Sequence, residues 1–184
     1  MSFTTKKITM LAMMIALSFV MVALLRFPIF PEAPFLTYEP KDIIIAIAGF
    51  AFGPIEATVI SVAVALIEMF TISATGPWGA LMNILSTLAF VLPAALLYRK
   101  ARTRKNAWIG LGLGVVTMTI TMLLWNYLVT PIYMGYPREA VAAMLLPVFL
   151  PFNLIKAGIN AVLVMLVYKP LMNALRRLNT IPER

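Results

Sequence analysis

Apolar residues gather into six segments along the chain, at residues 8–25, 42–53, 55–73, 77–98, 107–129 and 147–170. We interpret the first, fourth, fifth and sixth as long enough to cross a bilayer, which takes a helix of roughly 20 residues. The second and third segments are divided only by Gly53 and Pro54, a pair typical of a tight turn. We interpret them as two spans, the first of them short, and the alternative is one long bent helix. The pattern therefore predicts an all-α membrane protein, a single domain built as a bundle of six transmembrane helices.

Composition supports a membrane location. Of the 184 residues, 62% are apolar and 12% are charged, and the mean hydropathy is +0.95. A soluble domain has about 45–50% apolar and about 25% charged residues, so this chain has more apolar side chains than a core of its size can hide. The segment 8–25 is followed by Arg26, Phe27 and Pro28 instead of a small-residue cleavage site. We therefore expect a retained helix and not a cleaved signal peptide.

The basic residues lie mostly on one side of the predicted bundle. Eleven of the fifteen fall before the first span, between the fourth and fifth, or after the sixth: Lys6, Lys7, Arg99, Lys100, Arg102, Arg104, Lys105, Lys169, Arg176, Arg177 and Arg184. The other side receives Arg26, Lys41 and Arg138, and Lys156 falls inside a span. The positive-inside rule places both termini and the 99–106 connection in the cytoplasm. The excess of positive charge is thus explained by topology and not by nucleic-acid binding.

Two long connections are predicted on the outer side, at residues 26–41 and 130–146. The first is rich in proline and aromatic residues. Each proline removes a backbone donor and biases the preceding residue toward extended geometry. We expect this proline-rich loop to be non-helical and to form a lid over a site at the outer face.

Five strongly polar side chains fall in the outer halves of the last four spans: Glu68, Asn83, Asn126, Asn153 and Lys156. An ionisable group in mid-membrane costs at least about 2.5–3.5 kcal/mol, so its presence needs a reason. At a rise of about 1.5 Å per residue the five share one layer, and we predict a small-molecule site there. The alternative is a set of interhelical hydrogen bonds with a Glu68–Lys156 ion pair.

Other polar and aromatic residues have plainer interpretations. Glu56 is expected to face water beside the Gly53 turn, and Asn160 to pack between helices. Four aromatic residues lie near the predicted outer boundary, and most of them are expected to belong to an aromatic belt at the membrane interface: Trp78, Trp125, Tyr127 and Tyr133.

The residues that are missing narrow the chemistry. The chain has no cysteine and no histidine, which excludes metal–thiolate sites, cysteine nucleophiles and the commonest proton shuttle. It has no G-x-S-x-G or G-x-x-x-x-G-K-[ST] motif. An intramembrane enzyme or assembly factor is therefore disfavoured, and any ATPase must be another polypeptide. Lysine and asparagine side chains provide donors and acceptors for binding instead.

The first span contains Ala12 and Ala16, a small-x-x-x-small pattern that lets another helix approach closely. On spacing alone, packing within the chain is the favoured interpretation.

Several motifs resemble one family, the substrate-binding S components of energy-coupling factor (ECF) vitamin transporters, and within it the riboflavin type. The resemblance extends over nearly the whole chain. It rests on the runs Pro31-Glu32-Ala33-Pro34-Phe35-Leu36, Pro40-Lys41-Asp42-Ile43, Phe52-Gly53-Pro54, Gly76-Pro77-Trp78-Gly79-Ala80-Leu81-Met82-Asn83, Trp125-Asn126-Tyr127 and Pro151-Phe152-Asn153-Leu154-Ile155-Lys156.

The resemblance implies a function in the bacterial cell membrane. Riboflavin would be bound in the outer half as the transported ligand, with no resident cofactor. Asn126, Asn153 and Lys156 match positions that hydrogen-bond the flavin ring edge, with backbone groups near Leu36. Ala12 and Ala16 match a motif that docks on the transmembrane coupling subunit, which reverses the interpretation from spacing. Two separate ATPase subunits would hydrolyse ATP, and the loaded subunit would reorient in the bilayer.

Two residues depart from the family pattern. Lys41 stands where many riboflavin-type members are more acidic, and Glu68 matches no position that the family explains. Related members take up pyridoxine, pantothenate or hydroxymethylpyrimidine. A smaller vitamin whose amine or ring nitrogen is recognised by Glu68 is therefore the alternative ligand.

Overall fold

The computed structural model describes residues 5–31, 33 and 35–177, with side chains described as far as Asn173. Glu32, Pro34 and Arg184, which contributed to the sequence predictions, lie outside the described residues, as do the side chains of Arg176 and Arg177.

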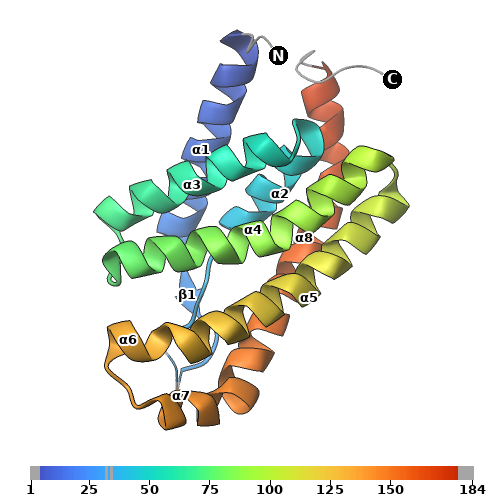
Figure 1. Cartoon of the computed structure of the whole chain (residues 1–184). Helices are drawn as coiled ribbons and strands as arrows, with labels where there is room; N and C mark the ends of the chain where they lie inside the picture. Colours follow the sequence, from blue (N-terminus) through green and yellow to red (C-terminus); the bar gives the residue numbers. More distant parts are fainter. Residues whose placement is uncertain (1–4, 32, 34, 178–184) are drawn as a thin grey trace.

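The described chain is a helical bundle with one small hairpin (Figure 1). In chain order its elements are α1 (Thr5–Leu25), β1 (Phe27–Pro28), β2 (Thr37–Tyr38), α2 (Lys41–Ala51), α3 (Pro54–Thr71), α4 (Gly76–Lys100), α5 (Arg104–Leu128), α6 (Thr130–Met134), α7 (Arg138–Met144), the π-helical turn η1 (Leu145–Phe149) and α8 (Leu150–Arg177). β1 and β2 pair antiparallel, with Phe27 opposite Tyr38 and Pro28 opposite Thr37.

Five helical stretches in the described part of the chain are long and apolar enough to cross a membrane: Thr5–Leu25, Pro54–Thr71, Gly76–Lys100, Arg104–Leu128 and Arg138–Asn173. The remaining predicted span, at residues 42–53, corresponds to α2, which has 11 residues. At about 1.5 Å per residue it is roughly 16 Å long, too short to cross a bilayer alone. The six-span count is therefore not confirmed, although α2 and α3 are two helices and the single bent helix is wrong.

α2 forms the centre of the bundle. All of its residues are buried, from Lys41 to Ala51. Its apolar run has no polar face after Asp42, which is typical of a helix covered on all sides. Gly53 then reverses the chain with φ of +123°, a conformation that glycine adopts without steric cost. Pro54 begins α3 at a position where its missing N–H has no consequence.

The bundle has two distinct ends (Figure 1). The start of α1, the α2–α3 turn, the α4–α5 connection and the last turns of α8 lie together, as the contacts between Lys7 and Glu56 and between Tyr98 and Tyr168 show. We call this the basic end, because it includes Lys6, Lys7, Arg99, Lys100, Arg102, Arg104, Lys105 and Lys169. The opposite end, here the cavity end, is formed by the hairpin, the α3–α4 turn, α6 and α7.

The connection predicted at 130–146 is helical, because α6, α7 and η1 occupy it and continue into α8. Among the described residues of the proline-rich segment 26–41, helix is found only at Lys41, where α2 begins.

Two glycines bring α4 and α5 into close contact. A Cβ on Gly110 would lie 2.7 Å from Ala94 Cα, and one on Gly114 would lie 2.2 Å from the Phe90 carbonyl oxygen. This G-x-x-x-G spacing is the close-approach pattern of membrane helices, and it was not recognised from the sequence. The same approach lets the Thr117 hydroxyl donate to the Ala89 carbonyl at 2.5 Å. In a regular helix the Ala89 carbonyl would accept from the N–H of residue 93, but residue 93 is a proline and has no N–H.

Replacing Gly114 with alanine is expected to destabilise the protein by about 1–3 kcal/mol, because the added methyl forces α4 and α5 apart. Gly112→Ala is the matched control on the same helix, since nothing lies within 4 Å of its Cβ position. Thermal unfolding of both purified variants in detergent checks the pair. Equal melting temperatures would contradict the close contact.

Candidate functional site

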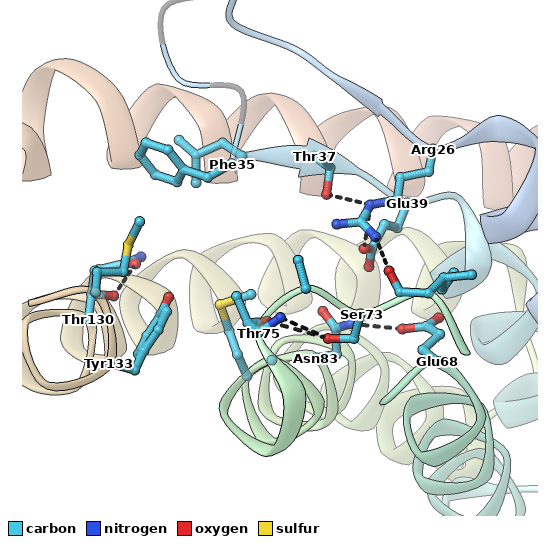
Figure 2. A pocket seen from close by; sticks show the side chains of 17 residues that line it. Arg26, Phe35, Thr37, Glu39, Glu68, Ser73, Thr75, Asn83, Thr130 and Tyr133 are labelled. Atoms are coloured by element: carbon cyan, nitrogen blue, oxygen red, sulfur yellow. Dashed lines mark hydrogen bonds and ion pairs between the residues drawn. The ribbon is translucent and has the colours of Figure 1, made fainter. Parts of the chain in front are cut away.

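The cavity end contains a cavity of about 250 Å³, which adjoins a smaller one of about 50 Å³. Together they fall near the lower limit of the roughly 300–1,000 Å³ typical of small-molecule sites. The wall of the larger cavity comes from the hairpin, from the ends of α3, α4 and α5 nearest to it, and from α6 (Figure 2). α8 contributes to the wall of the smaller one. All six predicted site residues line one or both of these cavities: Leu36, Glu68, Asn83, Asn126, Asn153 and Lys156.

A buried ion triad occupies the α3 side of the cavity. Lys41 Nζ lies 2.9 Å from Glu39 Oε2 and 2.7 Å from Glu68 Oε1, and Asn83 donates to Glu68 Oε2 at 2.8 Å. The Lys41 side chain is 3% exposed. Because a buried charge is stable only when paired and hydrogen-bonded, one lysine here holds two carboxylates at the cavity wall.

Glu39 lies near three cations, Lys41, Lys156 and Arg26. Burial opposes its ionisation, but the charges of Lys41, Lys156 and Arg26 outweigh burial and lower its pKa to about 2. A carboxyl with a depressed pKa stabilises the folded state above its unfolded pKa, and this stabilisation is lost as the pH falls through the folded value. Glu39 is therefore ionised at any physiological pH.

Arg26 joins the hairpin to α3 at the cavity (Figure 2). Its Nε lies 3.2 Å from Thr37 Oγ1 and 3.6 Å from Glu39 Oε1, and its Nη1 donates to the Ile72 carbonyl at 3.4 Å. The Arg26 side chain is one-third exposed, so the ion pair with Glu39 is weakened by solvent.

The α5–α8 side of the cavity has a different character. Asn126 and Asn153 each donate to the carbonyl one turn earlier in their helix, at 2.7 Å. Lys156 is buried, and within the described part of the chain it has no hydrogen bond or direct ion pair, although its charge attracts Glu39. A buried ammonium whose donors are not hydrogen-bonded is costly, and its presence in a cavity wall is typical of a group that meets a ligand.

Beneath the cavity, a second polar network fixes the hairpin. The Tyr38 hydroxyl donates to Asn160 Oδ1 at 2.8 Å, Asn160 Nδ2 donates to Asp42 Oδ2, and Thr87 donates to Asp42 Oδ1. Burial and the nearby Asp42 raise the pKa of Tyr38 to about 12, so its hydroxyl remains a donor. The network connects β2, α2, α4 and α8. Asn160 thus serves packing, as predicted.

One alternative and two expectations from the sequence are corrected here. The alternative Glu68–Lys156 ion pair is wrong, because the cation on Glu68 is Lys41, which the sequence placed in an outer connection. Glu56 does not face water, since it is buried and paired with Lys7 at 2.5 Å. Trp125 is buried in the core and not in an interfacial belt. Each error has the same cause, since apolar runs do not reveal which helix neighbours which.

Sequence reasoning also missed functional candidates. Glu39, Arg26 and Tyr133 line the cavity or hold its wall, but all were taken as connection or interface residues. The available signal was Glu39 and Lys41 flanking Pro40 immediately before an uninterrupted apolar run. Charges in that position must be buried or paired.

The chain matches known proteins over most of its length. Residues 6–168 fit the family model described as "ECF transporter, substrate-specific component". The chain is 29% identical to riboflavin transporter RibU of Staphylococcus aureus, covering 94% of each protein. It is 30% identical to riboflavin transporter FmnP of Bacillus subtilis, covering 89% of this chain and 90% of that protein.

A solved structure agrees with this relationship. The S component of a bacterial ECF transporter superposes with a TM-score of 0.79 at 29% identity, over 92% of this chain and 97% of that one. A second S-component structure, at 19% identity and a TM-score of 0.54, is similar in fold alone. By family match and by fold, the chain belongs to the substrate-specific components of ECF transporters.

Proposed function

We propose that this ECF substrate-specific component captures riboflavin in the cavity at the cavity end. The observation that carries the proposal is the buried Lys156, whose donors have no hydrogen bond in the described chain and which lines the same wall as Asn126 and Asn153. A flavin ring presents carbonyl oxygens and ring nitrogens along one edge, and an ammonium with two amides matches that edge. The named relatives are riboflavin transporters, which supports the same ligand.

The two sides of the cavity suit the two parts of riboflavin. Glu39 and Glu68 are acceptors on the α3 side, and carboxylate oxygens retain lone pairs after binding Lys41. The polyhydroxyl ribityl chain supplies donors for them. Lys156 and the asparagines on the α5–α8 side take the ring. Glu68 is already bound by Lys41 and Asn83, so it has less capacity to recognise the amine of a smaller vitamin.

Transport requires partners. The exposed face of α1 includes Ala12 and Ala16 beside the exposed Met13 and Leu17, and small residues there allow close approach of a coupling subunit. ATP hydrolysis is assigned to two separate ATPase subunits. The charge rule places the basic end, with both termini, in the cytoplasm of a bacterial cell, so the cavity opens toward the outside.

Quenching of riboflavin fluorescence by the purified protein tests the ligand. We expect saturable quenching at nanomolar concentrations, and weaker quenching with lumiflavin, which has the ring but no ribityl hydroxyls. Competition with pyridoxine, pantothenate and hydroxymethylpyrimidine provides the control. A protein that binds one of these and ignores riboflavin would refute the assignment. Equal affinity for lumiflavin would refute the role of the two carboxylates only.

A further inference from the structure

The basic end contains a separate cavity of about 200 Å³. Phe50 and Tyr98 form its aromatic part, and the α2–α3 turn around Gly53 forms another side. Arg99 and Arg102, from the end of α4 and the connection that follows it, complete the wall. The α2–α3 turn and the end of α4 lie at the opposite end of the bundle from the hairpin (Figure 1), so riboflavin binding does not use this cavity.

The charge in this cavity is unbalanced. Glu56 is its acidic wall residue, and the Glu56 carboxylate is bound by Lys7. Neither Arg99 nor Arg102 has a hydrogen bond or ion pair in the described part of the chain, although Arg102 is half-buried. Two guanidinium groups are therefore left without an anion. Guanidinium binds phosphate through two parallel hydrogen bonds, which makes arginine the preferred residue for that group.

The surroundings of the cavity point to a lipid. Ile55, in its wall, is 68% exposed, and Leu96, one turn before Lys100 on α4, is 52% exposed. Exposed aliphatic side chains beside a polar cavity at the end of a membrane bundle match the boundary between headgroups and acyl chains. The charge rule places this end at the inner leaflet, whose anionic lipids attract basic groups.

We propose that this cavity binds the phosphate of an anionic phospholipid of the inner leaflet, such as phosphatidylglycerol, through Arg99 and Arg102. The lipid's acyl chains lie over Ile55 and Leu96. A lipid held here contacts the α2–α3 turn and the end of α4 at once, and it stabilises their contact. α3 also begins in this wall without a side-chain cap, and after Pro54, which has no N–H, the backbone N–H groups of Ile55 and Glu56 add favourable donors for an anion.

The test measures the melting temperature of the purified full-length protein in an uncharged detergent. We expect phosphatidylglycerol to raise it by a few degrees, and phosphatidylcholine or inorganic phosphate to leave it unchanged. R99Q/R102Q is expected to lose the rise. R104Q/K105Q removes the same charge from neighbouring positions outside the cavity wall and is expected to keep it. Riboflavin quenching, which depends on the other end, checks that each variant is folded.

Three outcomes would overturn the proposal. An equal loss in both double variants would mean a diffuse attraction to the basic end. A rise produced by inorganic phosphate alone would identify a free-phosphate site. No rise in the unmodified protein would exclude the lipid. If R99Q/R102Q does not fold, R99K/R102K carries the test, because it keeps the charge but loses two-point binding. Its rise should be at least halved, and an undiminished rise would contradict the arginine geometry.

Discussion

Replacing Lys41 with methionine is expected to destabilise the protein by about 3–5 kcal/mol and to abolish riboflavin binding. The substitution leaves Glu39 and Glu68 as two buried carboxylates facing each other without their shared cation. Removing one partner of a buried ion pair costs this much because the remaining charge is uncompensated. The carboxylates can escape only by taking up protons or admitting water, and either response displaces the hairpin from α3. Thermal unfolding and fluorescence quenching measure the two effects.

Two further variants separate charge from size. The triple change Lys41→Met, Glu39→Gln and Glu68→Gln removes all three charges with little change of volume, and it should recover much of the lost stability. Lys105→Met is the matched single control, because that side chain is exposed and lines none of the three cavities. Recovery of stability without recovery of binding is the expected result for the triple variant, since the carboxylate acceptors are lost. A Lys41→Met protein as stable as the Lys105→Met protein would contradict the structural role of the triad.

Lys156→Met is expected to weaken riboflavin binding by roughly 10- to 100-fold while leaving the fold intact. A hydrogen bond from a charged donor is worth about 1.5–3 kcal/mol, and each 1.4 kcal/mol is about tenfold in affinity. Lys156 has no hydrogen bond or direct ion pair in the described chain, so its removal costs only its attraction to Glu39, which the relief of a buried ammonium offsets. The unliganded variant should therefore unfold at the same or a higher temperature. Titration of quenching, with melting temperatures measured in parallel, tests both statements.

Neighbouring variants locate the effect. Asn153→Ala should weaken binding less, because Asn153 is a neutral group and its Nδ2 already donates one of its two hydrogens to the Phe149 carbonyl. Asn160→Ala is the contrasting control on the same helix, since Asn160 belongs to the Tyr38–Asp42 network. It should lower the melting temperature more than the Lys156 change does. A Lys156→Met protein with unchanged affinity would remove Lys156 from the site.

The sequence predicted that five polar residues share a layer, and the family resemblance added Leu36. The predicted contacts among them differ from those in the structure, but all six line the adjoining cavities: Leu36, Glu68, Asn83, Asn126, Asn153 and Lys156. The depth of a side chain in the membrane depends on how many residues separate it from the end of its span. That number can be counted in the sequence. Partner choice depends on how helices are rotated and placed about one another. For that reason Lys41, Glu39 and Arg26 were assigned to connections, and the Glu68 partner was wrong.

The sequence by itself determined that this is a helical membrane protein with a basic end and a polar layer near the other, because hydropathy and charge placement act locally along the chain. Tertiary structure decided the rest. The central burial of α2, the α4–α5 contact through Gly110 and Gly114 and the single lysine between two glutamates depend on residues far apart in sequence. Their energies come from packing and from charge pairing in a medium without water, and both exist only once the helices are assembled.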